Sequence, residues 1–304
     1  MSDYTSYLTT DLTTGELHRC LLTGIAPRPI AFVSTIDRAG RVNLSPYSFF
    51  NIFGSNPPLV IFSPARRVRD NSSKHTLENV REVAECVVNI VDYPMVQQMS
   101  LASTEYPKGV NEFIKSGLTQ VQADVVAAPR VGESPLAMEC KVQQIIETGQ
   151  EGGAGNLVIA EIIKIHLRNT AIGENGLLSA EKLDLVGRMG SSYYVRASGD
   201  ALFEVPKPSR EHGIGVDQLP EATRHSRILT GNDLARLGSI TSLPTPEEIA
   251  ALAQDDRCQL FRLATLKFTS PNATEEIEKA RHLYAQELIA QGKSRKALSV
   301  LMAP

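Results

Sequence analysis

The sequence predicts a mainly β fold with additional helices, in which antiparallel strands form a small barrel. Three observations predict this fold class. Short stretches rich in β-branched and aromatic residues follow one another along the N-terminal part of the chain, and the helical stretches between them are short. These helices also do not alternate regularly with the strands, as they would in a parallel sheet. An antiparallel barrel is therefore favoured over a doubly wound nucleotide-binding sheet.

The first strands are predicted from four neighbouring segments. Residues 29–35 are rich in strand-forming residues, 37–40 end in glycine and form a turn, and 41–50 resume the extended pattern. Two adjacent prolines then open a short apolar strand over 59–62. We therefore expect three strands before the first helix of the barrel.

Short helices are predicted next. Thr76 is expected to be the N-cap of a helix, because apolar residues follow it at helical spacing: Leu77, Val80, Val83 and Ala84. A strand over 86–91 follows, then a helix that begins at Pro94, and a short helix over 112–117 that ends at glycine.

Two longer strands, 136–147 and 156–167, complete the predicted barrel. The glycine-rich residues 149–155 join them. This segment resembles a phosphate-binding loop, but it lacks the Gly-Lys-Ser/Thr ending and a following helix. It is therefore predicted to be a hairpin loop.

The chain is expected to contain a barrel domain over 1–199 and a C-terminal loop-rich and helical extension over 200–304. Prolines punctuate the extension between Pro206 and Pro246. Helices are predicted over 247–253, from Thr274 as N-cap to Gln291, and over 294–302. Because an apolar stripe follows one face of the longest helix, the extension is expected to pack on the barrel or on a partner subunit.

Composition excludes several classes of function. The net charge is −3 and the pI is about 6.1, which argues against a general nucleic-acid or anionic-membrane binder. The four cysteines are far apart and lack metal-ligand spacing. The N-terminus lacks the layout of a signal peptide, and no apolar run is long enough to span a membrane. These features predict a cytoplasmic protein.

Residues 43–51 form the first candidate site. Ser45, Tyr47 and Phe49 share one face of an extended strand. Pro46 cannot donate to a central ladder, so this strand is expected at an edge or a bulge, where its backbone can face a ligand. A plain edge strand with satisfied hydroxyl groups remains the alternative.

Residues 63–76 form the second candidate site. They combine cations and hydroxyl groups ahead of a helix N-terminus, the arrangement that a phosphate monoester requires. The cations are Arg66, Arg67, Arg69 and Lys74, and the hydroxyl groups belong to Ser63, Ser72, Ser73 and Thr76. A solvated charged loop before a capped helix remains the alternative. Arg188, which stands near two glycines, could bring another cation to a ligand.

These segments, in this order, resemble the flavin-reductase-like family of FMN-binding split-barrel proteins. The resemblance rests on residues 27–35, 43–51, 69–79, 88–89, 134–140 and 186–190. Residues 215–220 with 229–232 are similar to the longer-chain branch of that family. Two departures are His75, where an acidic residue is expected, and Ser191-Ser192, where a glycine is more usual.

The resemblance implies a Greek-key split β-barrel that forms a homodimer, with FMN near the subunit interface. It assigns the isoalloxazine and ribityl contacts to Ser34, Thr35, Asn43, Ser45, Pro46, Tyr47, Ser48 and Phe49. It assigns the phosphate contacts to Ser63, Arg69, Lys74 and Thr76. No general acid or base is obligatory for this chemistry, so the catalytic residues stay unassigned, and no metal ligand is expected.

The function implied is hydride transfer from NADH or NADPH to the flavin, with reduced flavin passed to oxygen or to a partner monooxygenase. Two alternatives remain open. One is a flavoredoxin-like electron carrier without a nicotinamide site, and the other is a flavin-dependent oxygenase or oxidase acting on an organic substrate. The sequence does not distinguish NADH from NADPH, nor does it identify the partner.

Overall fold

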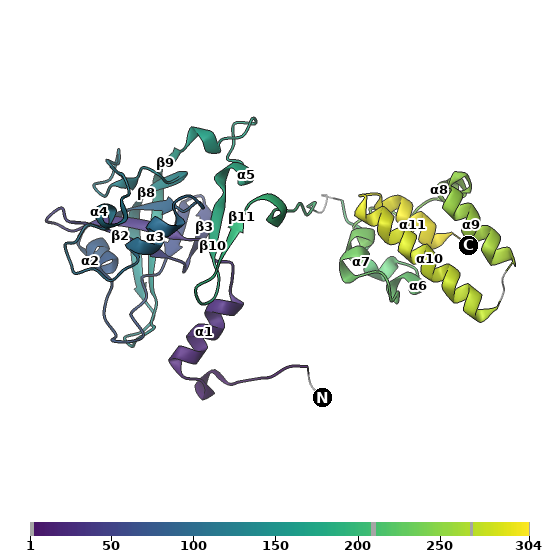
Figure 1. Ribbon diagram of the computed structural model, residues 1–304, viewed down its shortest axis with the longest axis horizontal. Coiled ribbons are helices and arrows are strands. Elements are labelled where there is room, and N and C mark those ends of the chain that lie inside the picture. The colour runs from purple at the N-terminus through teal and green to yellow at the C-terminus, as the bar shows by residue number, and fades with distance from the viewer. Residues whose placement is uncertain (1–2, 208–210, 268–269, 304) are drawn as a thin grey trace. The chain divides into compact units, whose positions relative to one another are not determined.

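The computed structural model describes residues 3–207, 211–267 and 270–303. The chain divides into two compact units, Met1–Phe203 and Glu204–Pro304 (Figure 1). The N-terminal unit contains all the strands that the structure describes, and the C-terminal unit is helical. Each unit has a hydrophobic core of its own.

A seven-stranded antiparallel sheet forms the N-terminal unit, in the order β2-β1-β5-β8-β9-β4-β3. Its strands are β1 Ala31–Ile36, β2 Val42–Tyr47, β3 Phe50–Ser55, β4 Pro58–Phe62, β5 Glu85–Ile90, β8 Leu136–Glu147 and β9 Asn156–Leu167. Two small ribbons accompany the sheet: β6 Gln120–Val121 with β7 Arg130–Val131, and β10 Leu185–Arg188 with β11 Tyr194–Ala197.

The sheet closes on itself because β2 and β3 lie at opposite edges of it yet follow one another in the chain. Only Ser48 and Phe49 separate them, so the three residue steps from Tyr47 to Phe50 span roughly 10 Å at most, at about 3.3–3.6 Å per step. The two edges must therefore meet at this point. The single strand predicted over 41–50 is wrong, because the chain changes edges there. The edge position predicted for Pro46 is confirmed.

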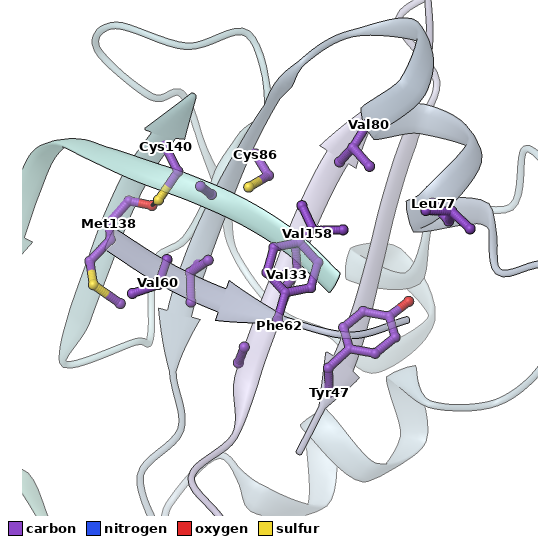
Figure 2. Packing of buried hydrophobic residues seen from close by; sticks show 13 residues of the cluster. Val33, Tyr47, Val60, Phe62, Leu77, Val80, Cys86, Met138, Cys140 and Val158 are labelled. Carbon is purple, nitrogen blue, oxygen red and sulfur yellow. Dashed lines mark hydrogen bonds between the residues drawn. The ribbon is translucent and has the colours of Figure 1, made fainter. Parts of the chain in front are cut away.

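The barrel core lies inside this curled sheet (Figure 2). Alternate residues of the strands point inward, including Val33 of β1, Val60 and Phe62 of β4 and Val158 of β9. β8 and β9 form the long hairpin predicted from the sequence, with the same limits. The loop at 149–155 joins them, as predicted.

In the described part of the N-terminal unit, four helices have at least five residues: α1 Thr14–Gly24, α2 His75–Glu82, α3 Val96–Ala102 and α4 Glu112–Ser116. α2 buries Leu77 and Val80 against the barrel. α3 and α4 contribute Met99 and Phe113 to a second cluster. Single turns complete the unit: η1 Thr9–Asp11, η2 Asn169–Ala171, α5 Ala180–Leu183 and η3 Gly199–Ala201.

Two details of these helices differ from the prediction. α2 starts at His75 with Lys74 as N-cap, so Thr76 is not the cap. The Thr76 hydroxyl instead accepts hydrogen bonds from Asn43 and Tyr47, which are far away in the sequence. α1 was not predicted, although Thr13 and Glu16 form a capping box at its start.

The C-terminal unit is more helical than the predicted loop-rich extension. Its elements are η4 Val216–Gln218, α6 Glu221–Arg224, α7 Gly231–Gly238, α8 Pro246–Ala251, η5 Leu252–Gln254, α9 Asp256–Lys267, α10 Pro271–Ala290 and α11 Ser294–Met302. Ser270, and not Thr274, caps α10, because its side chain accepts from the N–H of Ala273. The apolar face of α10 packs on α7 and α11 within the unit.

Among the described residues, none of the helices combines the length and the apolar character needed to cross a membrane.

Candidate functional site

The loop between β4 and α2 is held in shape by its own arginines. Arg66 donates from Nε to Asn71 Oδ1 at 2.5 Å and from Nη2 to the Asn71 carbonyl at 2.7 Å. Arg67 donates from Nη1 to Ser72 Oγ and to the Ser73 carbonyl, both at 2.8 Å. Because these bonds link residues five or six positions apart, they hold the loop in a tight turn.

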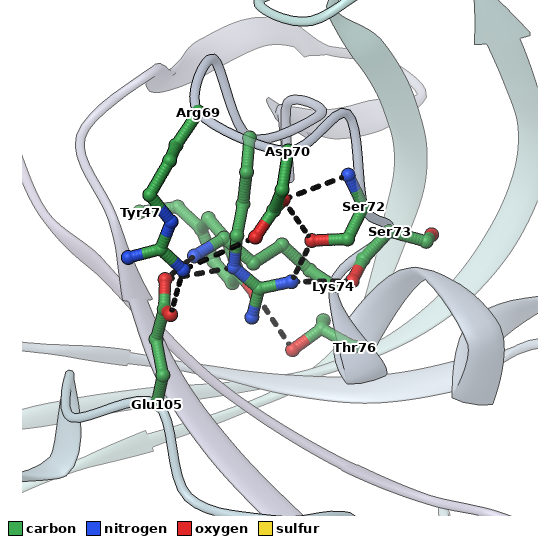
Figure 3. Close-up of polar contacts among 9 residues, drawn as sticks. Tyr47, Arg69, Asp70, Ser72, Ser73, Lys74, Thr76 and Glu105 are labelled. Atoms are coloured by element: carbon green, nitrogen blue, oxygen red, sulfur yellow. Dashed lines mark hydrogen bonds and ion pairs between the residues drawn. The ribbon is translucent and has the colours of Figure 1, made fainter.

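Glu105 lies close to three cations of this loop (Figure 3). Its carboxylate lies 2.8 Å from Arg67 Nε, 2.9 Å from Arg69 Nη2 and 3.9 Å from Lys74 Nζ. Three cations of the predicted phosphate site thus converge on one carboxylate. Glu105 was not predicted from the sequence, because it lies more than 30 residues from the loop.

Lys74 is the N-cap of α2 and is more buried than Arg69. Burial, and then the nearby charge of Arg67, lower the pKa of the Lys74 ammonium group. An anion placed beside Lys74 would favour the charged form. No described side chain caps the first turn of α2, so its leading N–H groups keep the positive end of the helix available.

The residues of this loop fit a phosphate monoester. Four cations against the two carboxylates of Asp70 and Glu105 leave a local charge of +2, which matches the charge of about −1.5 to −2 on a phosphate group at neutral pH. The Ser73 hydroxyl is buried and has no hydrogen-bond partner within the described part of the chain. A buried hydroxyl group without a partner is unfavourable, and a ligand oxygen would satisfy it.

The hairpin loop between β8 and β9 supports this cationic loop from one side. Arg66 N donates to the Ala154 carbonyl at 2.9 Å, and Gly153 N donates to the Arg66 carbonyl at 3.0 Å. A Cβ atom at Gly152 would lie 3.0 Å from the carbonyl oxygen of Val68. Glycine is needed there because the two loops approach so closely.

Asn43, Tyr47 and Thr76 form a buried polar network beside the loop. Asn43 Nδ2 and the Tyr47 hydroxyl both donate to Thr76 Oγ1 at 2.8 Å. Both lone pairs of the Thr76 hydroxyl are therefore used, which leaves its O–H as a donor. Burial raises the pKa of Tyr47.

Three further predicted contacts are buried and bonded within the fold. Ser34 donates to a backbone carbonyl, and Thr35 Oγ1 accepts from Asn79 Nδ2 at 3.0 Å. Ser63 Oγ accepts from the N–H of Asn156 at 3.0 Å. In this structure their hydroxyl groups stabilise the barrel, and ligand contacts through these residues stay a prediction.

The remaining predicted contacts lie where the chain crosses from β2 to β3. Ser45 and Pro46 are half-buried, and Phe49 is exposed. A pocket of about 180 Å³ is lined by Pro46 and Ser48 together with Arg188 and Tyr194. The tertiary structure therefore brings the cation noted at Arg188 next to the first candidate site.

Arg28 is a second residue of the site that was not predicted from the sequence. It is buried, and it donates to the carbonyl of Ile25 at 2.7 Å, to the carbonyl of Met189 at 3.1 Å and to Ser48 Oγ at 3.2 Å. No described carboxylate pairs with it. Arg28 therefore fixes the β2–β3 crossing relative to the β10–β11 turn. The only feature of the local sequence that could have pointed to Arg28 is its position between two prolines.

Residues 23–184 match the model of the flavin reductase like domain. The chain belongs to this family. The match ends within the N-terminal unit, so the whole C-terminal unit lies outside it.

Solved structures of similar proteins agree with this assignment. Nitrilotriacetate monooxygenase component B from Bacillus cereus is 29% identical, with a TM-score of 0.62 over 67% of this chain and 100% of that protein. A candidate flavin reductase with a split barrel domain from Shewanella frigidimarina is 27% identical, with a TM-score of 0.56 over 65% and 95%. The flavoredoxin of Desulfovibrio vulgaris is 27% identical, with a TM-score of 0.50 over 59% and 90%.

The flavin reductase-like assignment confirms the predicted fold, a split barrel with additional helices. It also supports an oxidoreductase activity that uses a flavin. The structure adds the arrangement of charges in the loop between β4 and α2, which fits a phosphate monoester.

Proposed function

We propose that this protein is an NADH- or NADPH-dependent flavin reductase that binds FMN and supplies reduced flavin. The observation that carries the proposal is the cationic loop between β4 and α2, whose charge of +2 and unpaired Ser73 hydroxyl suit the phosphate of FMN. Membership in the flavin reductase-like family supports the flavin itself. When bound, FMN would accept a hydride from the nicotinamide and deliver electrons to an acceptor.

The chain's own residues would bind and orient the cofactor in this proposal. Arg69, Lys74 and the first N–H groups of α2 would hold the phosphate by charge-assisted hydrogen bonds. The backbone of Ser45–Phe49 would line the ring system, held in place by Arg28. The positive charges of Arg28 and Arg188 near this segment would stabilise negative charge on the reduced ring.

We further propose a cytoplasmic homodimer that passes reduced flavin to a partner monooxygenase. Free cysteines fit a reducing compartment, and the similarity to a monooxygenase component B supports an oxygenase partner. The exposed apolar residues Phe49, Ile52 and Phe53 on and beside the edge strand β3 supply a surface for the second subunit.

Anaerobic stopped-flow reduction of the FMN-loaded protein tests the activity. Rapid bleaching of the flavin on mixing with NADH or NADPH alone is expected. If neither donor reduces the flavin while a reduced protein donor does, the reductase assignment is wrong. That result would favour an electron carrier, the second candidate, which the similarity to a flavoredoxin supports.

The phosphate site is tested separately by Lys74→Ala. Because a charge-assisted bond contributes about 1.5–3 kcal/mol, the FMN dissociation constant should rise at least about tenfold. Riboflavin, which lacks the phosphate, should bind the variant and the wild type equally. Lys115→Ala, at an exposed lysine on α4, serves as the control and should change neither titration. An unchanged FMN titration for Lys74→Ala would remove Lys74 from the site.

A further inference from the structure

A second pocket lies next to the one beside Ser48. It has a volume of about 310 Å³ and is formed by α3 and the β10–β11 hairpin. Tyr194 lines both pockets. The volume is at the lower end of the range of about 300–1,000 Å³ for small-molecule sites, which suits a group the size of a nucleoside.

Aromatic rings and a guanidinium group line this pocket. Arg196 lies over the ring of Tyr93, 4.0 Å from its centroid, and is held there by two 2.7 Å bonds to Asp184. Tyr93 is 48% exposed and Tyr194 is 37% exposed. Flat bases stack on such aromatic and guanidinium surfaces.

Polar groups of the pocket match the edge of a purine. Gln97 and Ser100 come from α3, and Ser192 comes from the hairpin turn. A glutamine carboxamide offers one donor and one acceptor side by side, and it pairs with adenine in this way in other complexes. No carboxylate is among the residues that line the pocket.

A cation lies at the boundary between the two pockets. Arg188 stacks on Tyr194, 4.5 Å from the ring centroid, and donates to the Ser191 carbonyl. It makes no ion pair with a carboxylate of the described residues. A pyrophosphate that passed Tyr194 would therefore meet a positive charge.

We propose that the pocket between α3 and the β10–β11 hairpin binds the adenosine half of the nicotinamide dinucleotide. The nicotinamide half would then reach the pocket beside Pro46 and Ser48, and Arg188 would contact the pyrophosphate that joins the halves. This proposal rests on the proposed function, because it assumes that the flavin ring lies along Ser45–Phe49.

The contribution of this pocket is measured by comparing two electron donors. NADH carries the adenosine, and reduced nicotinamide mononucleotide lacks it. Tyr93→Ala should raise the KM for NADH about tenfold, as expected for the loss of one stacked base. Gln97→Ala should raise it several-fold. Neither variant should change kcat, or the KM for reduced nicotinamide mononucleotide. Tyr193→Ala is the matched control, since Tyr193 is the next residue to Tyr194, 75% exposed and outside the pocket.

Calorimetric titration with ADP-ribose measures the same site without turnover. Wild type should bind it, and Tyr93→Ala and Gln97→Ala should bind it more weakly by the same factors as for NADH. Equal effects on both donors, or equal ADP-ribose affinities in all variants, would overturn the proposal. If the flavin is not reduced by NADH but ADP-ribose still binds with these variant effects, the proposed function fails and the nucleotide pocket stands.

Discussion

Glu139 of β8 is a carboxylate buried at the side of the barrel. It accepts backbone N–H groups from Asp124 at 2.8 Å, Val125 at 2.6 Å and Val126 at 3.1 Å, and it contacts His166 Nε2 at 2.5 Å. Burial opposes its ionisation, but these hydrogen bonds outweigh burial and lower the pKa of Glu139. The carboxylate therefore holds the 124–126 loop against the sheet.

Glu139→Gln is expected to destabilise the protein by about 1–3 kcal/mol at pH 7, because an amide NH₂ cannot accept from the backbone donors.

This loss depends on pH, because the pKa of Glu139 is lower in the folded protein than in the unfolded chain. The stabilisation by the Glu139 carboxylate is complete above the ordinary pKa of about 4.3, and it is lost as the pH falls through the lower pKa of the folded state. Urea unfolding of wild type and variant should therefore converge at acid pH. Glu174→Gln, at an exposed position, should unfold like wild type. A difference in unfolding free energy between wild type and Glu139→Gln that persists at low pH would contradict the stabilising role of the Glu139 carboxylate.

Thr76 accepts two hydrogen bonds in a buried network, so its removal should be costly. Thr76→Val keeps the shape and removes the oxygen to which the Asn43 amide and the Tyr47 O–H donate, at about 1–3 kcal/mol for each lost hydrogen bond. Tyr47→Phe removes one of these groups. The double variant should therefore be less destabilised than the sum of the single variants, as thermal unfolding would measure. Additive losses would mean that the network does not act as a unit.

At the scale of elements, β3 is an exposed edge strand that carries large apolar side chains. Phe53 is 63% exposed and Ile52 is 61% exposed, and a register irregularity separates Ile52 from Gly54. Unpaired edges of this kind pair with other chains unless they are covered. β3, which follows directly after the candidate flavin segment Ser45–Phe49, is thus also the proposed subunit contact.

Phe53→Lys should weaken the proposed dimer without unfolding the barrel, because the side chain is exposed in the single chain. Light scattering across a dilution series should show the variant as a monomer at concentrations where the wild type is a dimer. Ile114→Lys alters an even more exposed apolar residue on α4, and it should leave the dimer intact. A wild-type mass near 33 kDa at every concentration would refute the assembly.

At the scale of the whole molecule, the two units have separate cores. The C-terminal core is built from α7, α10 and α11, and it includes Leu237, Leu288 and Leu298. All the predicted flavin contacts belong to the N-terminal unit. The earlier expectation that the extension packs on the barrel or on a partner subunit stays a prediction.

Removal of residues 204–304 is expected to leave FMN affinity within about twofold of the full chain, since no predicted contact is lost. Equilibrium titration of FMN into the truncated and full-length proteins checks this. Any role of the C-terminal unit in choosing the electron donor or acceptor would appear as a changed KM with unchanged FMN affinity. Loss of FMN from a folded, truncated protein would place part of the flavin site in the C-terminal unit.

The sequence by itself determined the elements whose signals are local. The β8–β9 hairpin follows from two runs of strand-forming residues separated by glycines, and α11 has the limits that its apolar spacing predicts. The cluster of cations ahead of α2 could also be predicted, because its members are neighbours in the chain.

Only the tertiary structure decided what depends on residues far apart in the sequence. The start of α2 was misplaced because Thr76 bonds to Asn43 and Tyr47 instead of capping the helix. Glu105 joins the cationic loop through its ion pair with Arg69, and Arg188 and Tyr194 reach the segment at Ser48 because β10 bridges to Arg28. Side-chain pairing at these distances follows from how the sheet curls, and the local pattern of the chain carries no signal of it.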